Sequence, residues 1–259
     1  MKKSKIKKIL SKKNKMPITC LTAYSKATAQ IADKYCDLIL VGDSLGMVLY
    51  GMKTTKEVKI ETMIRHCKTV KNFAKKSLVV FDMPYKTYAN KFIAYNNARK
   101  VMKMTKCDAV KLEGGKKIVN IVRHLVKKGI PVMGHVGLLP QTSTTFKAKG
   151  KNLIQKKKIL NDAIAISKTG AFAIVLECIV ENLAKKITKD VSIPTIGIGA
   201  SKYCDGQILV IDDMLGLSDF YPKFVKKYSN LKKIIERSVK NYVNDVRLRK
   251  FPSYKNVYK

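Results

Sequence analysis

The chain alternates between short apolar runs and longer segments in which apolar residues recur with helical spacing. The apolar runs, rich in Val, Ile and Leu, lie at residues 18–23, 38–42, 78–81, 109–112, 131–137, 172–176, 194–200 and 208–211. Most of them are continuously apolar, which is typical of strands in a parallel sheet that is covered on both faces. The pattern therefore predicts a protein built from repeated strand–helix units.

Eight such units in about 200 residues favour a closed (β/α)8 barrel, the TIM barrel, over an open doubly wound sheet. The helical segments lie at residues 26–36, 57–74, 94–104, 116–127, 153–168 and 180–188, and the link between the last two runs is too short for a full helix. We predict one α/β domain over residues 1–259. It has a basic N-terminal segment over about 1–16, for which a short helix closing the barrel floor is favoured over a disordered arm, and a C-terminal helical extension over about 223–259, with one or two helices within 224–248.

The charge balance raises the question of nucleic-acid binding. The chain has 53 Lys and Arg against 18 Asp and Glu, a formal net charge of +35. Only six of the basic residues are Arg, the side chain best suited to bidentate recognition of bases and phosphates, and the Lys are spread along the whole chain. No helix-turn-helix, RRM or zinc-finger spacing accompanies them. We therefore expect a solvated basic surface and no specific nucleic-acid partner, and keep a nucleic-acid-binding protein as the alternative of a different class.

The sequence also bears on the compartment. Its longest apolar runs are shorter than the ~20 residues of a membrane-spanning helix, so we expect no membrane association. The N-terminal MKKSKIKKILSKKNK lacks the apolar core and the cleavage site of a signal peptide. Six cysteines are scattered without a C-x-x-C pair, as is typical of thiols in a reducing cytosol. The expected location is cytoplasmic.

Acidic residues are scarce in this chain, yet four of them stand where an apolar run ends. They are Asp43, Asp82, Glu113 and Glu177. In a (β/α)8 barrel the carboxyl ends of the strands converge on one face, so these four side chains are expected to meet at the barrel mouth. Several carboxylates held together need a countercharge. An all-oxygen set without Cys or His at ligand spacing indicates Mg²⁺ or Mn²⁺ rather than Zn²⁺.

Other residues near these strand ends admit two interpretations each. Lys111 precedes Glu113 by two residues and so points to the same side of its strand, which suits a small anionic substrate bound to a metal. Any one of the acids alone is more typical of a helix N-cap, an explanation that weakens for four together. Ser44 is a turn residue or a hydrogen-bond donor to substrate, and His135 is structural or part of the site. Gly114 and Gly115 form an anion-binding helix start or a plain tight turn.

Nine motifs, in order and over almost the whole chain, resemble those of ketopantoate hydroxymethyltransferases. They are TCLTAYS, LILVGDSLGMVLYG, FDMPY, VKLEGG, PVMGHVGLLPQ, VLEC, PTIGIGA, CDGQILV and PKFVKKY. The resemblance implies a (β/α)8 barrel of the phosphoenolpyruvate mutase and isocitrate lyase group. It also implies a homo-oligomer, commonly a decamer of two pentamer rings, in which C-terminal helices exchange between neighbours.

The resemblance further implies an activity. The family transfers a hydroxymethyl group from 5,10-methylenetetrahydrofolate to 3-methyl-2-oxobutanoate, which gives 2-dehydropantoate (ketopantoate) for pantothenate and coenzyme A biosynthesis. By motif, Asp43 and Asp82 are expected to bind Mg²⁺ directly, with Glu113 completing the site through water. The expected roles of the remaining residues are to hold the keto-acid carboxylate (Ser44 and Lys111), to accept the proton (Glu177) and to orient the substrate (His135). A lyase or mutase of the same metal-barrel group is the alternative enzyme.

The chain departs from the family pattern in two places. The family usually has Asp after TAY, where this chain has Ser25, and a loop that typically reads GGYKVQGK is TTFKAKGK at residues 144–151. Both departures lie outside the metal and keto-acid residues, so they bear on the folate side of the site rather than on the class of reaction.

Overall fold

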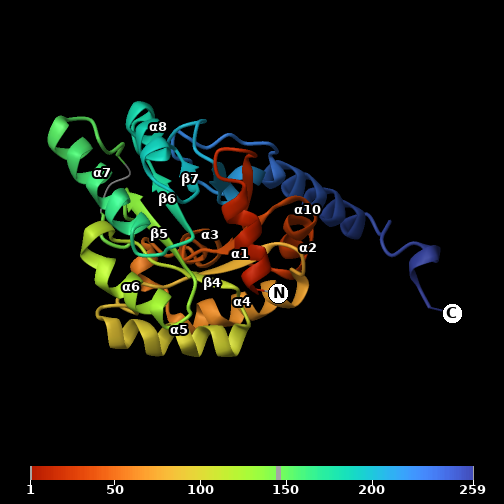
Figure 1. Cartoon of the computed structure of the whole chain (residues 1–259). Helices are drawn as coiled ribbons and strands as arrows, with labels where there is room; N and C mark the ends of the chain where they lie inside the picture. Colours follow the sequence, from red (N-terminus) through yellow and green to blue (C-terminus); the bar gives the residue numbers. More distant parts are fainter. Residues whose placement is uncertain (1, 144–146, 259) are drawn as a thin grey trace.

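Eight parallel strands close into a barrel in chain order, and β8 pairs back with β1 (Figure 1). The computed structural model describes residues 2–143 and 147–258. The strands are β1 (Ile18–Thr22), β2 (Leu38–Val41), β3 (Leu78–Asp82), β4 (Ala109–Lys111), β5 (Val132–Gly137), β6 (Ala173–Glu177), β7 (Thr195–Ile198) and β8 (Gly206–Leu209). The predicted (β/α)8 barrel is confirmed, and the open sheet is not.

Most of the helices surround this barrel on its outside, and α10 projects from it (Figure 1). They are α1 (Lys2–Ser11), α2 (Lys26–Tyr35), α3 (Leu45–Tyr50), α4 (Ile60–Phe73), α5 (Lys91–Thr105), α6 (Val119–Lys127), α7 (Leu153–Ser167), α8 (Glu181–Asp190), α9 (Ile211–Leu215) and α10 (Leu231–Arg247). Short 3-10 turns lie at Thr55–Glu57, Gly115–Ile118 and Tyr254–Asn256. As the short link predicted, β7 passes to β8 without a helix.

The core has two layers because successive strand residues face opposite ways. In β2, Leu38 and Leu40 belong to the cluster inside the barrel, whereas Ile39 and Val41 belong to the cluster between strands and helices. Both clusters consist of buried apolar side chains. This explains why the strands read as continuously apolar: each face of the sheet is covered.

Helix α1 lies at the amino-terminal end of the barrel. Ile9 is 1% exposed and belongs to the inner cluster together with Ile18 and Leu78, the first residues of β1 and β3. Lysines of the same segment bond to the rim: Lys12 Nζ lies 2.6 Å from Asp37, and Lys13 Nζ lies 2.9 Å from Asp205. The basic N-terminal segment thus packs under the barrel and leaves the opposite end free for chemistry.

Several helical segments differ from their predicted bounds, most clearly those predicted at 57–74 and 224–248. The segment predicted at 57–74 is divided into a 3-10 turn and α4, because Val58 is extended and buried between them. In the predicted segment 224–248 the helix starts only at Leu231, where the Asn230 side chain accepts from the Lys233 N–H at 3.3 Å. Short helices α3 and α9 were not predicted, since five or six residues are too few to show a helical period.

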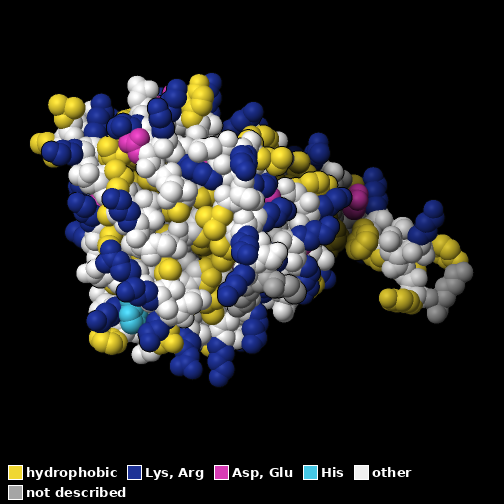
Figure 2. Space-filling view, viewed as in Figure 1, with side chains coloured by type: hydrophobic (Ala, Val, Ile, Leu, Met, Phe, Trp, Pro, Cys, Tyr) yellow, Lys and Arg dark blue, Asp and Glu magenta, His cyan; other side chains and the backbone are white. Residues whose placement is uncertain are grey.

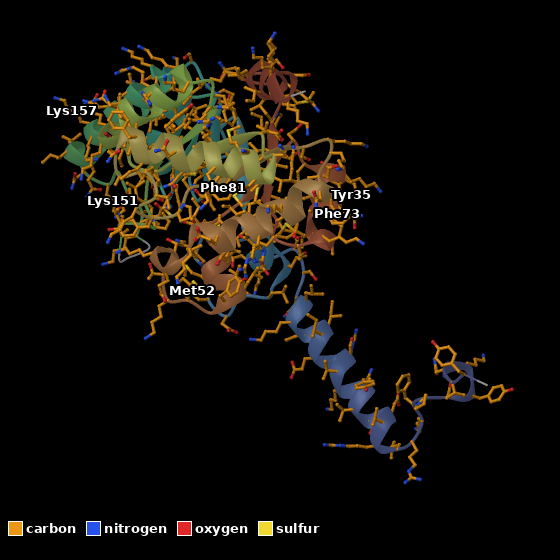
Figure 3. The ribbon with its side chains drawn as sticks, turned by 90° about the horizontal axis from the view of Figure 1, so that it is seen from below. Tyr35, Met52, Phe73, Phe81, Lys151 and Lys157 are labelled. Atoms are coloured by element: carbon orange, nitrogen blue, oxygen red, sulfur yellow. The ribbon has the colours of Figure 1, made fainter. Side chains whose placement is uncertain are left out.

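The C-terminal helix α10 leaves the barrel body and carries the chain away from it (Figures 1 and 3). None of its residues is buried within the chain. Basic side chains cover the visible face of the molecule without forming a single stripe, and acidic ones are few there (Figure 2). Among residues 2–143 and 147–258, no helix has the length and apolar character needed to cross a membrane.

Candidate active site

The carboxyl ends of the strands open into a cavity of about 350 Å³. Its walls hold every residue that the sequence singled out for chemistry: Asp43, Ser44, Asp82, Lys111, Glu113, His135 and Glu177. These side chains come from five consecutive strand ends, β2 to β6. Residues more than 130 positions apart in the chain therefore meet in one place.

The N-cap explanation of the four acids is wrong in this structure. The residues at the N-cap positions of the helical elements that follow β2, β3, β4 and β6 are Ser44, Asn90, Gly114 and Val180. Each acid instead stands at the end of a strand or one or two residues beyond it, with its side chain directed into the cavity. The positions of the acids follow from the direction of the strands and not from N-capping of the next helix.

Lys111 and Asp82 form a buried ion pair across neighbouring strands. They are register partners in β4 and β3, and Lys111 Nζ lies 2.8 Å from each carboxylate oxygen of Asp82. Burial alone would lower the pKa of Lys111, but Asp82, Asp43 and Glu113 together raise it. Lys111 therefore stays charged at the mouth of the barrel, as binding of an anionic substrate requires.

Asp43 and Glu113 are joined by a residue that sequence reasoning missed. Gln141 Nε2 donates to Asp43 Oδ2 at 2.8 Å, and the Gln141 N–H donates to Glu113 Oε1 at 3.0 Å. Tyr88 donates to Gln141 Oε1 at 2.5 Å, so the amide is held in one orientation. Gln141 is 1% exposed. The signal was present, because Gln141 ends the motif PVMGHVGLLPQ beyond β5, but a neutral amide in a loop does not by itself indicate a site residue.

The electrostatics of this cluster favour a bound cation. Burial raises the pKa of Asp43 well above its usual range, and the nearby Asp82 adds to this effect. Among the described residues that line the cavity, the four acids face two basic side chains, Lys111 and His135. A divalent ion would supply the missing positive charge.

His135 lies between two glutamates. Its Nδ1 is 3.5 Å from Glu113 Oε2 and its Nε2 is 3.2 Å from Glu177 Oε2, although neither contact has the geometry of a hydrogen bond. Burial and the charge on Lys111 lower the pKa of His135, but the two carboxylates outweigh them and raise it to about 9. His135 is therefore an imidazolium at neutral pH.

The contacts of Ser44 and of the glycine pair bear on the alternatives left open by the sequence. Ser44 makes no capping bond to α3; its Oγ lies 2.8 Å from the Tyr24 hydroxyl, and the residue lines the cavity. At the glycine pair, the Lys116 N–H donates to Asp162 Oδ1 at 3.0 Å. A side chain of the protein thus occupies the place where an anion would bind, and Gly114 and Gly115 form a tight turn.

Ser25 and residues 147–151 are the parts of the two departures from the family pattern that the structure describes. Ser25 is the N-cap of α2, where its side chain accepts from the Thr28 N–H at 3.3 Å, and Ser and Asp serve this role equally well. Of the TTFKAKGK segment, residues 144–146 lie outside the described residues. Its later part is tied to β6, since the Lys149 N–H donates to Cys178 O at 2.7 Å.

The acidic side chains at the barrel mouth are compatible with a bound Mg²⁺ ion. In the part of the chain that the structure describes, no three His, Cys, Asp or Glu side chains are grouped closely enough to ligate one ion together. Mg²⁺ does not need such a cage, because it binds through one or two carboxylates and takes its other ligands from water and substrate. Asp43 and Asp82, whose residues touch through the Asp43 N–H and Asp82 Oδ2 at 3.4 Å, fit this mode.

Comparison of the fold shows structural relatives. The barrel superimposes on a 2,3-dimethylmalate lyase of the PEP mutase/isocitrate lyase superfamily with a TM-score of 0.63, at 10% identity over 98% of this chain and 87% of that one. A phosphoenolpyruvate phosphomutase from Streptomyces platensis subsp. rosaceus gives a TM-score of 0.61, at 10% identity over 94% and 87% of the two chains. At such low identity these likenesses show the fold alone.

Comparison of the sequence is more specific. The chain is 53% identical over 254 residues, 98% of its length and 99% of the relative's, to the 3-methyl-2-oxobutanoate hydroxymethyltransferase of Pelagibacter ubique (strain HTCC1062). It is 50% identical to the enzyme of the same name from Bartonella tribocorum (strain CIP 105476 / IBS 506), over 97% of this chain and 94% of the relative. The family profile described as ketopantoate hydroxymethyltransferase matches residues 3–254. The chain belongs to the ketopantoate hydroxymethyltransferase family.

Proposed function

We propose that this protein transfers a hydroxymethyl group from 5,10-methylenetetrahydrofolate to 3-methyl-2-oxobutanoate, giving 2-dehydropantoate in pantothenate biosynthesis. Family membership over residues 3–254 supports the reaction. The observation that carries the mechanism is the convergence of four acids, Lys111 and His135 in one cavity at the barrel mouth.

In this proposal Asp43 and Asp82 would bind Mg²⁺ directly, and Glu113 would bind it through a water molecule. Gln141 supports this set, because it fixes the carboxylates of Asp43 and Glu113 by two hydrogen bonds. The bound ion would polarise the keto group of the substrate and so favour loss of a proton from the neighbouring branched carbon.

Lys111 and Ser44 hold the carboxylate of the keto acid. Lys111 contributes a full positive charge, since its neighbouring carboxylates raise its pKa. Ser44 contributes a hydroxyl that Tyr24 orients at 2.8 Å. A substrate bound in this way has one orientation relative to the acids of β3 and β6.

Glu177 is the base. It accepts the proton from the branched carbon, and the electron pair of the broken C–H bond attacks the methylene carbon of the folate. The bonds from that carbon to the two folate nitrogens break as the nitrogens take the proton held by Glu177 and one proton of a water molecule, the hydroxide of that water becomes the new hydroxyl, and tetrahydrofolate leaves. His135, whose Nε2 lies 3.2 Å from Glu177 Oε2, orients the substrate.

The assembly is also part of the proposal. The exposed face of α10 carries apolar side chains, including Ile235, Val239, Tyr242 and Val246. We place this face against neighbouring copies in a homo-oligomer, the decamer that the sequence resemblance implies, and regard residues 1–259 as one barrel domain with its extension. The scattered cysteines of the sequence support a cytoplasmic location.

Proton exchange on the keto acid alone tests substrate, metal and base together. Wild-type protein with Mg²⁺ in D₂O is expected to exchange the proton of the branched carbon, and chelation of the metal is expected to stop this. Glu177→Gln should retain keto-acid binding and lose most of the exchange, because the amide cannot accept the proton. Wild-type exchange in Glu177→Gln would contradict the base assignment.

The lyase or mutase alternative is separated by product. Its structural support is the shared barrel, at TM-scores near 0.6. An enzyme of that kind is not expected to use folate. Formation of ketopantoate from 3-methyl-2-oxobutanoate and methylenetetrahydrofolate supports the transferase, and cleavage of a C–C or P–C bond without ketopantoate supports the alternative.

A further inference from the structure

The cavity has a second sector that the keto-acid chemistry does not use. The metal, carboxylate and base residues come from the ends of β2 to β6, whereas the sector above β7, β8 and β1 is lined mainly by apolar side chains such as Ile198, Leu209 and Val210. Asp213 is the acid that lines the cavity close behind β8. Because the strand order is closed, this sector faces the acid cluster across the barrel mouth.

Asp213 is a buried carboxyl with few partners. It lies in the short helix α9 and is 9% exposed. Among the described residues it accepts one side-chain hydrogen bond, from Ser218 Oγ to Oδ1, and no salt bridge reaches it. Burial raises the pKa of this carboxyl. Asp213 therefore stands in the wall of the cavity without a countercharge.

Thr55 is an independent sign that a polar ligand belongs here. It lines the same cavity, is 3% exposed, and its Oγ1 has no hydrogen-bond partner among the residues described. Thr55 comes from the turn that follows α3, above β2, so it and Asp213 lie on the two sides of the β1 sector. A buried hydroxyl left without a partner costs free energy unless a ligand satisfies it.

The remaining walls suit a flat ring. Met47, Met52, Leu217 and Phe224 contribute apolar surface to the cavity. The Phe224 ring packs against the backbone of Gly199, where an added Cβ would lie 2.5 Å from the ring, so its position is fixed. In Figure 3 Met52 lies on the side of the body from which α10 departs, and Phe220 and Phe224 line the same cavity as Met52.

We propose that Asp213 and Thr55 bind the pteridine ring of the folate co-substrate by its amino–lactam edge, with the ring lying against Met47, Met52 and Phe224. This edge presents two adjacent N–H donors, the ring N–H and the 2-amino group, which match the two oxygens of one carboxylate as a guanidinium does. The Thr55 hydroxyl forms a hydrogen bond with another polar atom of the ring. The inference rests on the proposed function, because that function brings a folate to this cavity.

Charge excludes the keto acid from this sector. 3-Methyl-2-oxobutanoate is an anion and would meet the uncompensated carboxyl of Asp213, whereas Lys111 lies on the opposite side of the mouth. Charge therefore separates the two substrates. The anionic keto acid binds at Lys111, and the donor edge of the pteridine ring binds at Asp213. The methylene group of the folate then points towards the centre of the mouth, where the branched carbon of the keto acid is activated.

A double-mutant cycle between protein and co-substrate tests this contact. The enzyme variants are wild type and Asp213→Asn, and the co-substrates are methylenetetrahydrofolate and its analogue without the 2-amino group. In wild type, removing the amino group is expected to reduce kcat/KM about tenfold, and in Asp213→Asn by less than about twofold, because the bond is already weakened. Asp212→Asn is the matched control, since the neighbouring Asp212 does not line the cavity.

The proton-exchange reaction separates the possible failures. For Asp213→Asn, the ratio of folate-dependent kcat/KM to the folate-free exchange rate is expected to fall about tenfold, and Thr55→Val should lower it about threefold. Equal loss of both rates, or an equal effect of the 2-amino group in both enzymes, overturns the contact and leaves Asp213 a structural residue bonded to Ser218. If wild type itself neither exchanges nor forms ketopantoate, it is the proposed function that fails.

Discussion

Several side chains of the candidate site share hydrogen-bond partners. Gln141 is the clearest case, since its side chain and backbone together bond to Asp43, Glu113, Tyr88 and the backbone of Met83. An amide suits the position because it donates to a carboxylate and accepts from a phenol at once. The residue carries no charge and touches no reacting atom, yet it orients two of the three residues proposed to hold the metal.

Gln141→Ala is expected to weaken Mg²⁺ binding about 10-fold or more, because residues that orient metal ligands have effects of this size. The measurement is the Mg²⁺ concentration that gives half-maximal proton exchange on the keto acid. Thr142→Ala, one position along the same loop and exposed, is the matched control. An unchanged Mg²⁺ requirement in Gln141→Ala would show that the bridge through this amide does not support the metal.

At the scale of secondary-structure elements, a carboxylate holds a turn at the amino-terminal end of the barrel by hydrogen bonds. Asp33, in α2, accepts from the backbone N–H groups of Lys75, Lys76 and Ser77, which form the turn between α4 and β3. The nearest bond is 2.7 Å long. This turn leads into β3, the strand that ends at Asp82. The hydrogen bonds of Asp33 therefore hold the amino-terminal end of a strand whose carboxyl end carries a site residue.

Asp33→Asn is expected to destabilise the fold by about 1 kcal/mol at pH 7, because the partly exposed carboxylate loses its charge-assisted bonds. Burial alone would raise the pKa of Asp33, but the three N–H donors lower it. The stabilisation is therefore fully present above the unfolded pKa of about 3.9 and is lost as the pH falls through the lower folded value.

Urea unfolding at several pH values measures this effect. The difference in unfolding free energy between wild type and Asp33→Asn should be constant from pH 7 to about pH 5 and shrink towards pH 3. Asp190→Asn, which removes a surface pair with Lys186 at 2.9 Å, is the control and should change stability little. A difference that grows in acid would contradict the role of the Asp33 charge.

At the scale of the whole molecule, the apolar face of α10 is exposed in a single chain. The helix projects from the barrel (Figure 3), and Val239 and Tyr242 are 54% and 56% exposed. An amphipathic helix with an uncovered apolar face is typical of a contact between subunits. No residue of α10 belongs to either of the two core clusters of the barrel among the residues that the structure describes.

Val239→Glu is expected to lower the molar mass in solution without changing the circular dichroism of the barrel, because it puts a charge on the apolar face of α10. Light scattering after size exclusion measures the mass. Lys240→Glu, the next residue, is the control for charge alone. If Val239→Glu leaves the mass of wild type unaltered, α10 is not the contact between copies.

The high net charge also belongs to this scale. With +35 spread over the surface, weak retention of DNA at low salt is expected to disappear near physiological ionic strength and to be independent of sequence. Fluorescence anisotropy with two unrelated duplexes measures this. Tight binding of one duplex at physiological salt would revive the nucleic-acid alternative.

Much of the molecule followed from the amino-acid sequence by itself. The (β/α)8 order, the family and the gathering of Asp43, Asp82, Glu113 and Glu177 at one end could be predicted, because hydrophobic period is local and all strands of a parallel barrel point the same way. Strand ends are therefore spatial neighbours however far apart they lie in the chain.

Only the tertiary structure decided which of these groups touch. Gln141 bridges two acids and His135 lies between two glutamates, while Asp213 faces them from the other side of the mouth. No period or motif encodes such contacts, since they depend on how each loop after a strand turns back over the barrel. Side-chain partners are set by packing across the fold, and the sequence records only the residues that packing brings together.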